Sequence, residues 1–167
     1  SLGQVNMTSV TAFQSTDRYR RDDFDFSPVA DQVLNTDIDL FNLTQELRFS
    51  SKSAGLFNWT SGIFLFRTSE VDDGVQASTQ STILEDSESI RNGFAIFGQS
   101  SYEFNSHLKL PAGLRFDYEK NRVDVDRIIE GIGEGESFED DASFTAVSPK
   151  LALGYDFHPN VFLFANV

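Results

Sequence analysis

The 167-residue sequence predicts an all-β fold, an antiparallel transmembrane β-barrel segment of about seven strands. Three observations predict this class. Apolar and polar residues alternate over several stretches, short connections alternate with long acidic ones, and the charges of the four clearest strands fall on one face, apart from Lys120 at the end of a strand. Barrels of this kind have strands of about 10 residues, apolar outside and polar inside, with short turns at one end and long loops at the other.

The first half of the chain contains three predicted strands. Residues 4–13 form a weak strand, and residues 41–50 form the clearest one, with Phe41, Leu43, Leu47 and Phe49 on a single face. A short turn at 51–56 leads to a strand at 57–68, which is apolar on both faces. Its orientation therefore stays open.

Four more strands are predicted, at residues 92–104, 108–120, 148–157 and 161–167. Short turns at 105–107 and 158–160 connect two pairs of them. Pro111 lies inside a predicted strand. Because proline has no backbone N–H to donate to a neighbouring strand, we expect a local bulge there.

The alternation divides the strand residues into an apolar set and a set that carries the charges. The apolar set is assigned to lipid, because an Arg on the lipid face at the membrane mid-plane costs roughly 2–4 kcal/mol. The set predicted to face lipid is Phe41, Leu43, Leu47, Phe94, Ile96, Leu110, Leu114, Phe116, Leu151 and Leu153. The set predicted to face the lumen is Glu46, Arg48, Gln99, Glu103, Lys109, Arg115, Asp117, Lys150 and Asp156. The lumen set either lines a path for substrate or forms salt bridges between neighbouring strands.

Acidity is concentrated in three segments, 14–40, 69–90 and 119–143, with net charges of −4, −6 and −6 in a chain of net charge −13. We expect these segments to be long loops, which in compact proteins are usually functional or disordered. Their aspartates and glutamates could supply oxygen ligands to Ca²⁺, but none has EF-hand spacing. A solvated loop surface is the favoured interpretation. The acidic groups are Asp22, Asp23 and Asp25, then Asp72 and Asp73, and finally Glu139, Asp140 and Asp141.

Several functional classes are disfavoured. The sequence has no Cys, so it has no disulfide, thiolate metal site or catalytic thiol, and its few basic residues disfavour nucleic-acid binding. No apolar run approaches the ~20 residues of a transmembrane helix. His107 and His158 fall in predicted turns, and the glycines at 131–135 adjoin Glu134 and Glu136, which would repel phosphate. We expect no enzyme activity, cofactor or metal site. No signal peptide is visible, so the protein is not exported or the chain starts after its signal.

Six motifs, in order over almost the whole chain, resemble strands of TonB-dependent outer-membrane receptors. They are FNLTQELRFSS at 41–51, NWTSGIFLF at 58–66, GFAIFGQSSY at 93–102, LPAGLRFD at 110–117, FTAVSPKLALGY at 144–155 and VFLFAN at 161–166. Two positions depart from the family pattern. Pro111 stands where Thr is usual, and Phe164 stands where Tyr is usual.

The resemblance implies a barrel of about 22 strands with a plugged lumen. Such receptors take up ferric siderophores, haem, cobalamin or saccharides across the outer membrane of Gram-negative bacteria, using energy from the TonB complex. Residues 1–167 would be an internal part of this barrel, without the plug, the TonB-contacting segment or the C-terminal strands. The implied partners are outer-membrane lipid, the TonB complex through those missing parts, and a small-molecule or metal-chelate substrate. Within the lumen set, Glu46 and Arg48 suit contact with the plug.

Two other functions remain open at this point. A passive porin would share the barrel but lack the plug and the coupling to TonB. A soluble acidic β-domain that binds cations or carbohydrate would show the same alternation, because the pattern does not reveal which face points outward.

Overall fold

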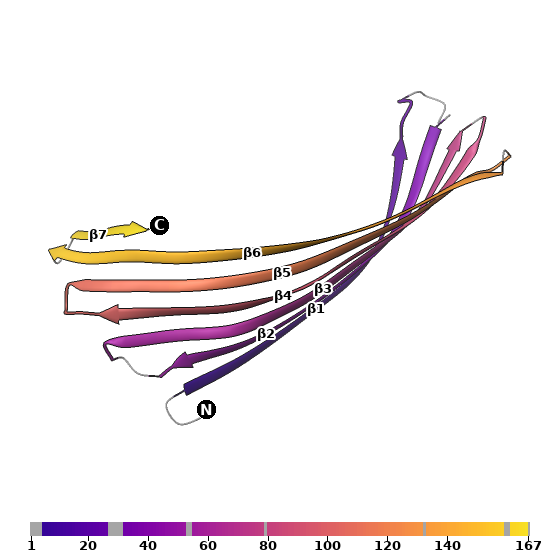
Figure 1. Ribbon diagram of the computed structural model, residues 1–167. Helices are drawn as coiled ribbons and strands as arrows, with labels where there is room; N and C mark the ends of the chain where they lie inside the picture. Colours follow the sequence, from indigo (N-terminus) through magenta and orange to yellow (C-terminus); the bar gives the residue numbers. More distant parts are fainter. Residues whose placement is uncertain are drawn as a thin grey trace.

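The computed structural model describes residues 5–26, 32–52, 55–78, 80–131, 133–158 and 161–166. These residues form one seven-stranded antiparallel sheet in which the strands follow sequence order (Figure 1). The predicted all-β class is confirmed. The strands are β1 (Val5–Asp23), β2 (Gln32–Ser51), β3 (Phe57–Ser78), β4 (Thr82–Glu103), β5 (Leu108–Ile129), β6 (Glu134–His158) and β7 (Val161–Asn166). Among the described residues, no helix is long and apolar enough to cross a membrane.

The strands are about twice as long as predicted, and the expectation of long acidic loops is wrong. Residues 69–78 and 82–90 form the distal halves of β3 and β4, which pair continuously from Phe57↔Tyr102 to Ala77↔Thr82. The acidic segments at 14–40 and 119–143 likewise lie mostly in β1 and β2 and in β5 and β6. Strand pairing uses only backbone groups, so it continues where both faces carry polar side chains.

The connections at both ends of the sheet are short where the structure describes them. In the β4–β5 connection, Asn105 Oδ1 accepts hydrogen bonds from the backbone N–H groups of His107 and Leu108 at 2.8 and 2.9 Å. Between β5 and β6, Gly131 and Gly133 have φ values of 94° and 70°, which favour glycine. The predicted turn at 158–160 lies mostly outside the described residues, and β6 extends to His158.

Pro111 does not produce the expected bulge. Pairing between β5 and β6 is interrupted between Lys109↔Gly154 and Ala112↔Leu151, but the register is the same on both sides of the gap. Pro111 still pairs with Ser101 of β4. The missing N–H therefore weakens one side of the ladder without adding a residue to the strand. A register shift occurs instead between β6 and β7, at Asp156 and His158.

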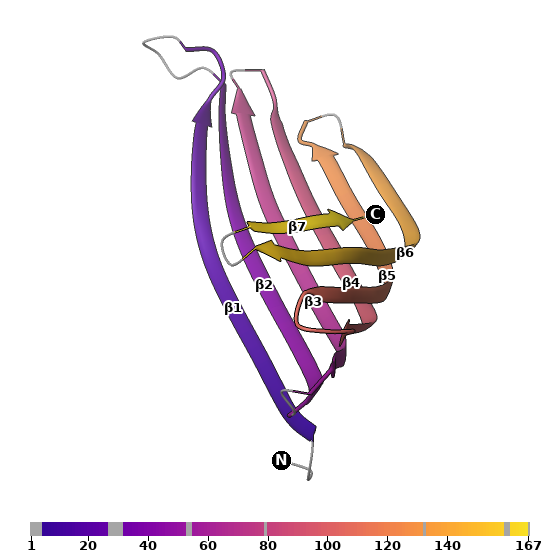
Figure 2. The same cartoon turned by 90° about the vertical axis from the view of Figure 1, so that its left-hand side faces the viewer.

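The sheet is strongly curved and twisted (Figures 1 and 2), and its two faces differ in crowding. In β3, Ile63, Leu65 and Val75 are exposed, whereas Gly62 and Gly74 on the opposite face are buried. In β4, Ala95 lies on the crowded face and is only 2% exposed. Because curvature brings side chains together on the inner side of a sheet, we refer to the crowded face as the concave face and to the other as the convex face.

The strand register places each predicted set on one face of the sheet, and which of the two faces meets lipid remains a prediction. Directly paired residues of neighbouring strands point to the same side of a sheet. All ten residues of the lipid set lie on the convex face, and all nine of the lumen set lie on the concave face. The open orientation of β3 is also settled. Trp59, Ile63 and Leu65 lie on the convex face, while Phe64 and Phe66 lie on the concave face.

The distal half of the convex face carries rows of directly opposed carboxylates. One row runs across four neighbouring strands, in the order Asp37, Asp73, Asp86 and Asp126. The adjacent level pairs Glu88 with Asp124 and Asp124 with Glu139. Like charges at directly opposed positions destabilise a sheet. Most of the chain's acidic residues therefore lie in regular strands, on both faces of the sheet, and the directly opposed rows named here are on the convex face.

Neutralising one carboxylate of this row should stabilise the distal hairpins. We expect Asp86→Asn to slow amide hydrogen exchange in residues 82–90 at low salt. The free energy of local opening should rise by roughly 0.2–1 kcal/mol. The gain should shrink as added salt screens the repulsion. Glu85→Gln is the matched control, because Glu85 lies on the concave face and pairs with Arg127. Equal slowing by both changes would contradict a repulsive row.

Candidate functional site

The candidate site is a polar band on the concave face, and ion pairs organise most of the predicted lumen set. Arg48 pairs with Glu46 and Arg115 with Asp117, each two residues along the same strand. Arg115 Nε donates to both Asp117 oxygens at 2.9 and 3.0 Å. Between strands, Lys109 Nζ lies 3.4 Å from Glu103 Oε1. Within the lumen set, two ion pairs are therefore local to one strand and one is a bridge between strands of the kind that the sequence suggested.

Aromatic rings lie among these charges. The Arg115 guanidinium lies 6.0 Å from the centre of the Phe97 ring, within range of a cation–π contact. Phe97 is directly opposite Gly62 and covers it, since a Cβ on Gly62 would lie 2.6 Å from Phe97 Cζ. Phe66 covers Gly93 in the same way. The concave face therefore presents flat apolar rings beside its ion pairs.

Two further members of the lumen set, Gln99 and Lys150, line a hollow of about 290 Å³ near the short-turn end of the sheet. Lys150 makes no ion pair with any described residue. Its ammonium group is thus available to an acceptor from outside this part of the chain. The concave-face residues that line the hollow are Ser50, Asn58, Thr60, Gln99, Ser101, Pro111 and Lys150.

Sequence reasoning missed Asn58 and Thr60 as lining residues of this hollow. Both belong to the strand whose two faces were equally apolar in the sequence, so neither face could be assigned to the polar side. The register with β2 and β4 supplies that assignment. Asp156, the last member of the lumen set, lies on the concave face at the end of β6 beside the register shift.

The acidic groups considered for Ca²⁺ are separated by the alternation of the strands. Asp72 lies on the concave face and Asp73 on the convex face. In β6, Asp140 lies on the concave face, whereas Glu139 and Asp141 lie on the convex face. Among the described residues, no group of three or more carboxylate or imidazole side chains is placed to hold a metal ion.

The convex face carries an apolar belt. On β5 it consists of every second residue from Leu108 to Tyr118. At about 3.4 Å per residue and a tilt near 40°, these ten steps rise roughly 26 Å, which matches the ~25 Å apolar band of membrane barrels. Its edges are aromatic. Tyr102 and Phe104 pack edge to face at 4.9 Å near the short turns, and Tyr118 packs on Phe94 at 5.6 Å toward the distal half.

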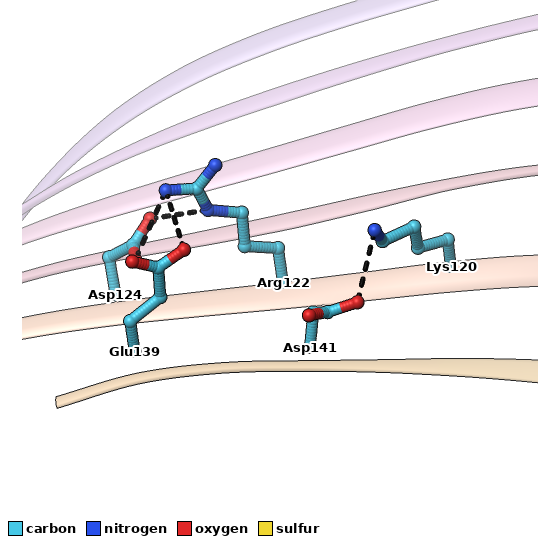
Figure 3. Close-up of polar contacts among 5 residues, drawn as sticks. All are labelled: Lys120, Arg122, Asp124, Glu139 and Asp141. Atoms are coloured by element: carbon cyan, nitrogen blue, oxygen red, sulfur yellow. Dashed lines mark hydrogen bonds and ion pairs between the residues drawn. The ribbon is translucent and has the colours of Figure 1, made fainter.

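Charged groups begin directly beyond Tyr118 (Figure 3). Lys120 Nζ lies 3.0 Å from Asp141 of β6, and Arg122 lies between Asp124 of its own strand and Glu139 of β6. The hydrogen bond and charge of Asp124, together with the charge of Glu139, raise the pKa of the Arg122 guanidinium above its usual value. This sharp change from rings to ion pairs marks the distal border of the belt.

Residues 3–167 match the family model for the β-barrel of TonB-dependent receptor-like proteins. The chain belongs to the TonB-dependent receptor family. The match covers almost the whole sequence and agrees with the order of the sequence motifs and with the long antiparallel strands. A comparison with curated protein sequences gave no significant match.

Solved structures of TonB-dependent receptors have the same fold. The ferric yersiniabactin uptake receptor FyuA from Yersinia pestis is 14% identical, with a TM-score of 0.84 over 99% of this chain and 26% of that one. The ferric citrate transporter FecA in its unliganded form is 16% identical, with a TM-score of 0.68 over 98% and 24%. The closed ferric-catecholate import receptor Fiu from E. coli K12 is 13% identical, with a TM-score of 0.74 over 98% and 30%. The chain thus spans about a quarter to a third of these proteins.

Proposed function

We propose that this chain is part of the wall of an outer-membrane receptor that takes up a scarce nutrient with energy from the TonB complex. The observation that carries the proposal is the apolar belt of the convex face, which has the height of the apolar band of membrane barrels and lies opposite a more polar concave face. In this arrangement the lipid set faces the bilayer and the lumen set faces the interior. Those assignments follow from burying the belt in lipid, where a charged side chain is costly.

The substrate is proposed to be a metal chelate. A ferric siderophore is favoured over haem, cobalamin or a saccharide. Support comes from the similar structures, whose names refer to ferric yersiniabactin, ferric citrate and ferric catecholates. Mixed ion pairs and aromatic rings on the concave face suit transient contacts with a bulky polar solute. In the hollow near the short-turn end of the sheet, Lys150 also offers a hydrogen-bond donor to the plug or to the substrate.

Fractionation of cells that express the full-length protein tests the location. It should sediment with the outer membrane and resist extraction without detergent. Recovery of the folded protein from the cytosol, or as a detergent-free monomer, would instead favour the soluble acidic β-domain.

Uptake measurements test the energy coupling. Radiolabelled ferric siderophores should accumulate only in cells with an intact TonB complex, and accumulation should stop when the proton-motive force is dissipated. Uptake that continues in TonB-deficient cells would identify a passive channel and overturn active transport.

A further inference from the structure

A second hollow lies on the concave face in the distal half of the sheet, where β1 to β4 run side by side (Figure 2). Gly74 of β3 is at its centre, directly opposite Thr36 of β2 and Glu85 of β4. The hollow, here called the Gly74 hollow, has a volume of about 160 Å³. It is lined by Arg20, Leu34, Thr36, Asp72, Gly74, Gln76, Ile83, Glu85 and Ser87.

The absence of a side chain at Gly74 keeps the hollow open. A Cβ at this position would lie 3.3 Å from the Glu85 carbonyl oxygen and 3.8 Å from Leu34 Cδ1. Every neighbouring position on the concave face of β2, β3 and β4 carries a side chain. These side chains therefore form a wall around a single gap.

The charges around the hollow are paired, except for Asp72. Arg20 Nε lies 2.8 Å from Asp22, and Glu85 lies 3.6 Å from Arg127 Nε. Asp72 forms no ion pair with a described residue, and its Oδ1 is covered and accepts no hydrogen bond from one. The other oxygen of this carboxylate, Oδ2, is not covered, so a donor on a ligand in the hollow can reach Asp72 there and compensate a carboxylate that has no partner among the described residues.

We propose that the Gly74 hollow binds a protonated amino group of a small molecule, with Asp72 as the counter-charge. An ammonium group offers three donors, which Asp72 and the oxygens of Thr36, Gln76 and Ser87 match as acceptors. Three charged residues line the hollow. Arg20 is paired with Asp22 and Glu85 with Arg127, so Asp72 is the uncompensated charge and disfavours an anion. Ca²⁺ takes six to eight oxygen ligands, and a single unpaired carboxylate supplies at most two of them, so the hollow does not suit Ca²⁺.

The size of the hollow limits what enters it. At about 30 Å³ per water molecule, it holds roughly five waters, which suits an alkylammonium arm rather than a whole chelate. This proposal rests on the proposed function in one respect. The alkylammonium arm is taken to belong to an amine-bearing compound that the receptor takes up. Binding at the hollow itself requires neither TonB nor the membrane potential.

The test is a ligand-observed NMR titration of the purified full-length protein in detergent, with 1,4-diaminobutane as the probe. Asp72→Asn keeps the shape of the side chain and should weaken diaminobutane binding by about tenfold or more, because a charge-assisted hydrogen bond is lost. Asp73→Asn is the matched control. It makes the same charge change one residue away on the convex face and should leave affinity unchanged.

A steric variant and two further probes complete the test. Gly74→Leu fills the hollow and should also abolish binding, while 1,4-butanediol and succinate should bind far more weakly than diaminobutane to the unaltered protein. Unchanged affinity in Asp72→Asn, equal losses in both Asp variants, or preference for succinate would overturn the proposal.

The two proposals fail separately. If TonB-dependent uptake is observed but diaminobutane does not bind, the Gly74 hollow is wrong and the receptor function stands. If diaminobutane binds as expected but uptake does not depend on TonB, the ammonium site stands and active transport is wrong.

Discussion

Leu114→Arg should reduce the amount of folded full-length receptor in the outer membrane by at least about tenfold, since an Arg near the mid-plane of the lipid face costs roughly 2–4 kcal/mol. Leu114 lies in the middle of the apolar belt and is 57% exposed on the convex face. In the proposed orientation that exposed side chain contacts only lipid. Its replacement therefore has no counter-charge or water to compensate the guanidinium.

Ala146→Arg is the control for this prediction. Ala146 lies on the concave face within the height of the belt, directly opposite Asp117. The same guanidinium would there face the interior with a carboxylate beside it, so folding and insertion should be close to normal. Folded receptor is measured in outer-membrane fractions by its shifted electrophoretic mobility before heating. Equal tolerance of both changes would mean that the two faces have been assigned in reverse.

Gly93→Ala should destabilise the barrel by about 1–3 kcal/mol, the usual cost of overpacking. A Cβ on Gly93 would lie 2.5 Å from Phe66 Cε1 and 2.5 Å from the Tyr118 carbonyl oxygen. The ring can rotate away only by losing its place over the glycine. The carbonyl belongs to the β5 backbone and cannot move without disturbing the pairing of β4 with β5.

Gly98→Ala is the matched control, because Gly98 is in the same strand but on the convex face. A Cβ there meets no atom within 4 Å. Replacing a glycine in a compatible conformation commonly stabilises a protein by about 0.4–1 kcal/mol. Urea unfolding of both variants in detergent micelles gives the comparison. A loss at Gly98 that matches the loss at Gly93 would contradict the difference in crowding between the faces.

The sequence predicted the strands well wherever one face of the sheet is apolar. Residues 41–50 and 108–118 show clear alternation, and in the register their apolar residues share one side of the sheet. The strand at 57–68 was ambiguous for a physical reason. Phe64 and Phe66 occupy the concave face, where Phe66 covers Gly93. Apolar residues therefore occur on both faces of this strand, and the sequence pattern does not distinguish the two faces.

The distal halves of the strands were missed because both faces are polar there. On β3, Val71 and Val75 share the convex face with Asp73, and this charge on the otherwise apolar side interrupts the alternation that would have indicated a strand. The same cause hid the Gly74 hollow. Its lining residues come from four strands, and only the register shows which of them oppose a glycine.

The carboxylate rows also have a mechanical consequence. On a curved sheet, side chains on the convex face splay apart, whereas those on the concave face converge. Repulsion along the row from Asp37 to Asp126 is therefore relieved as the sheet bends away from it. Electrostatic repulsion between the carboxylates of this row therefore favours the curved form of the sheet, and these charges contribute to the shape of the protein.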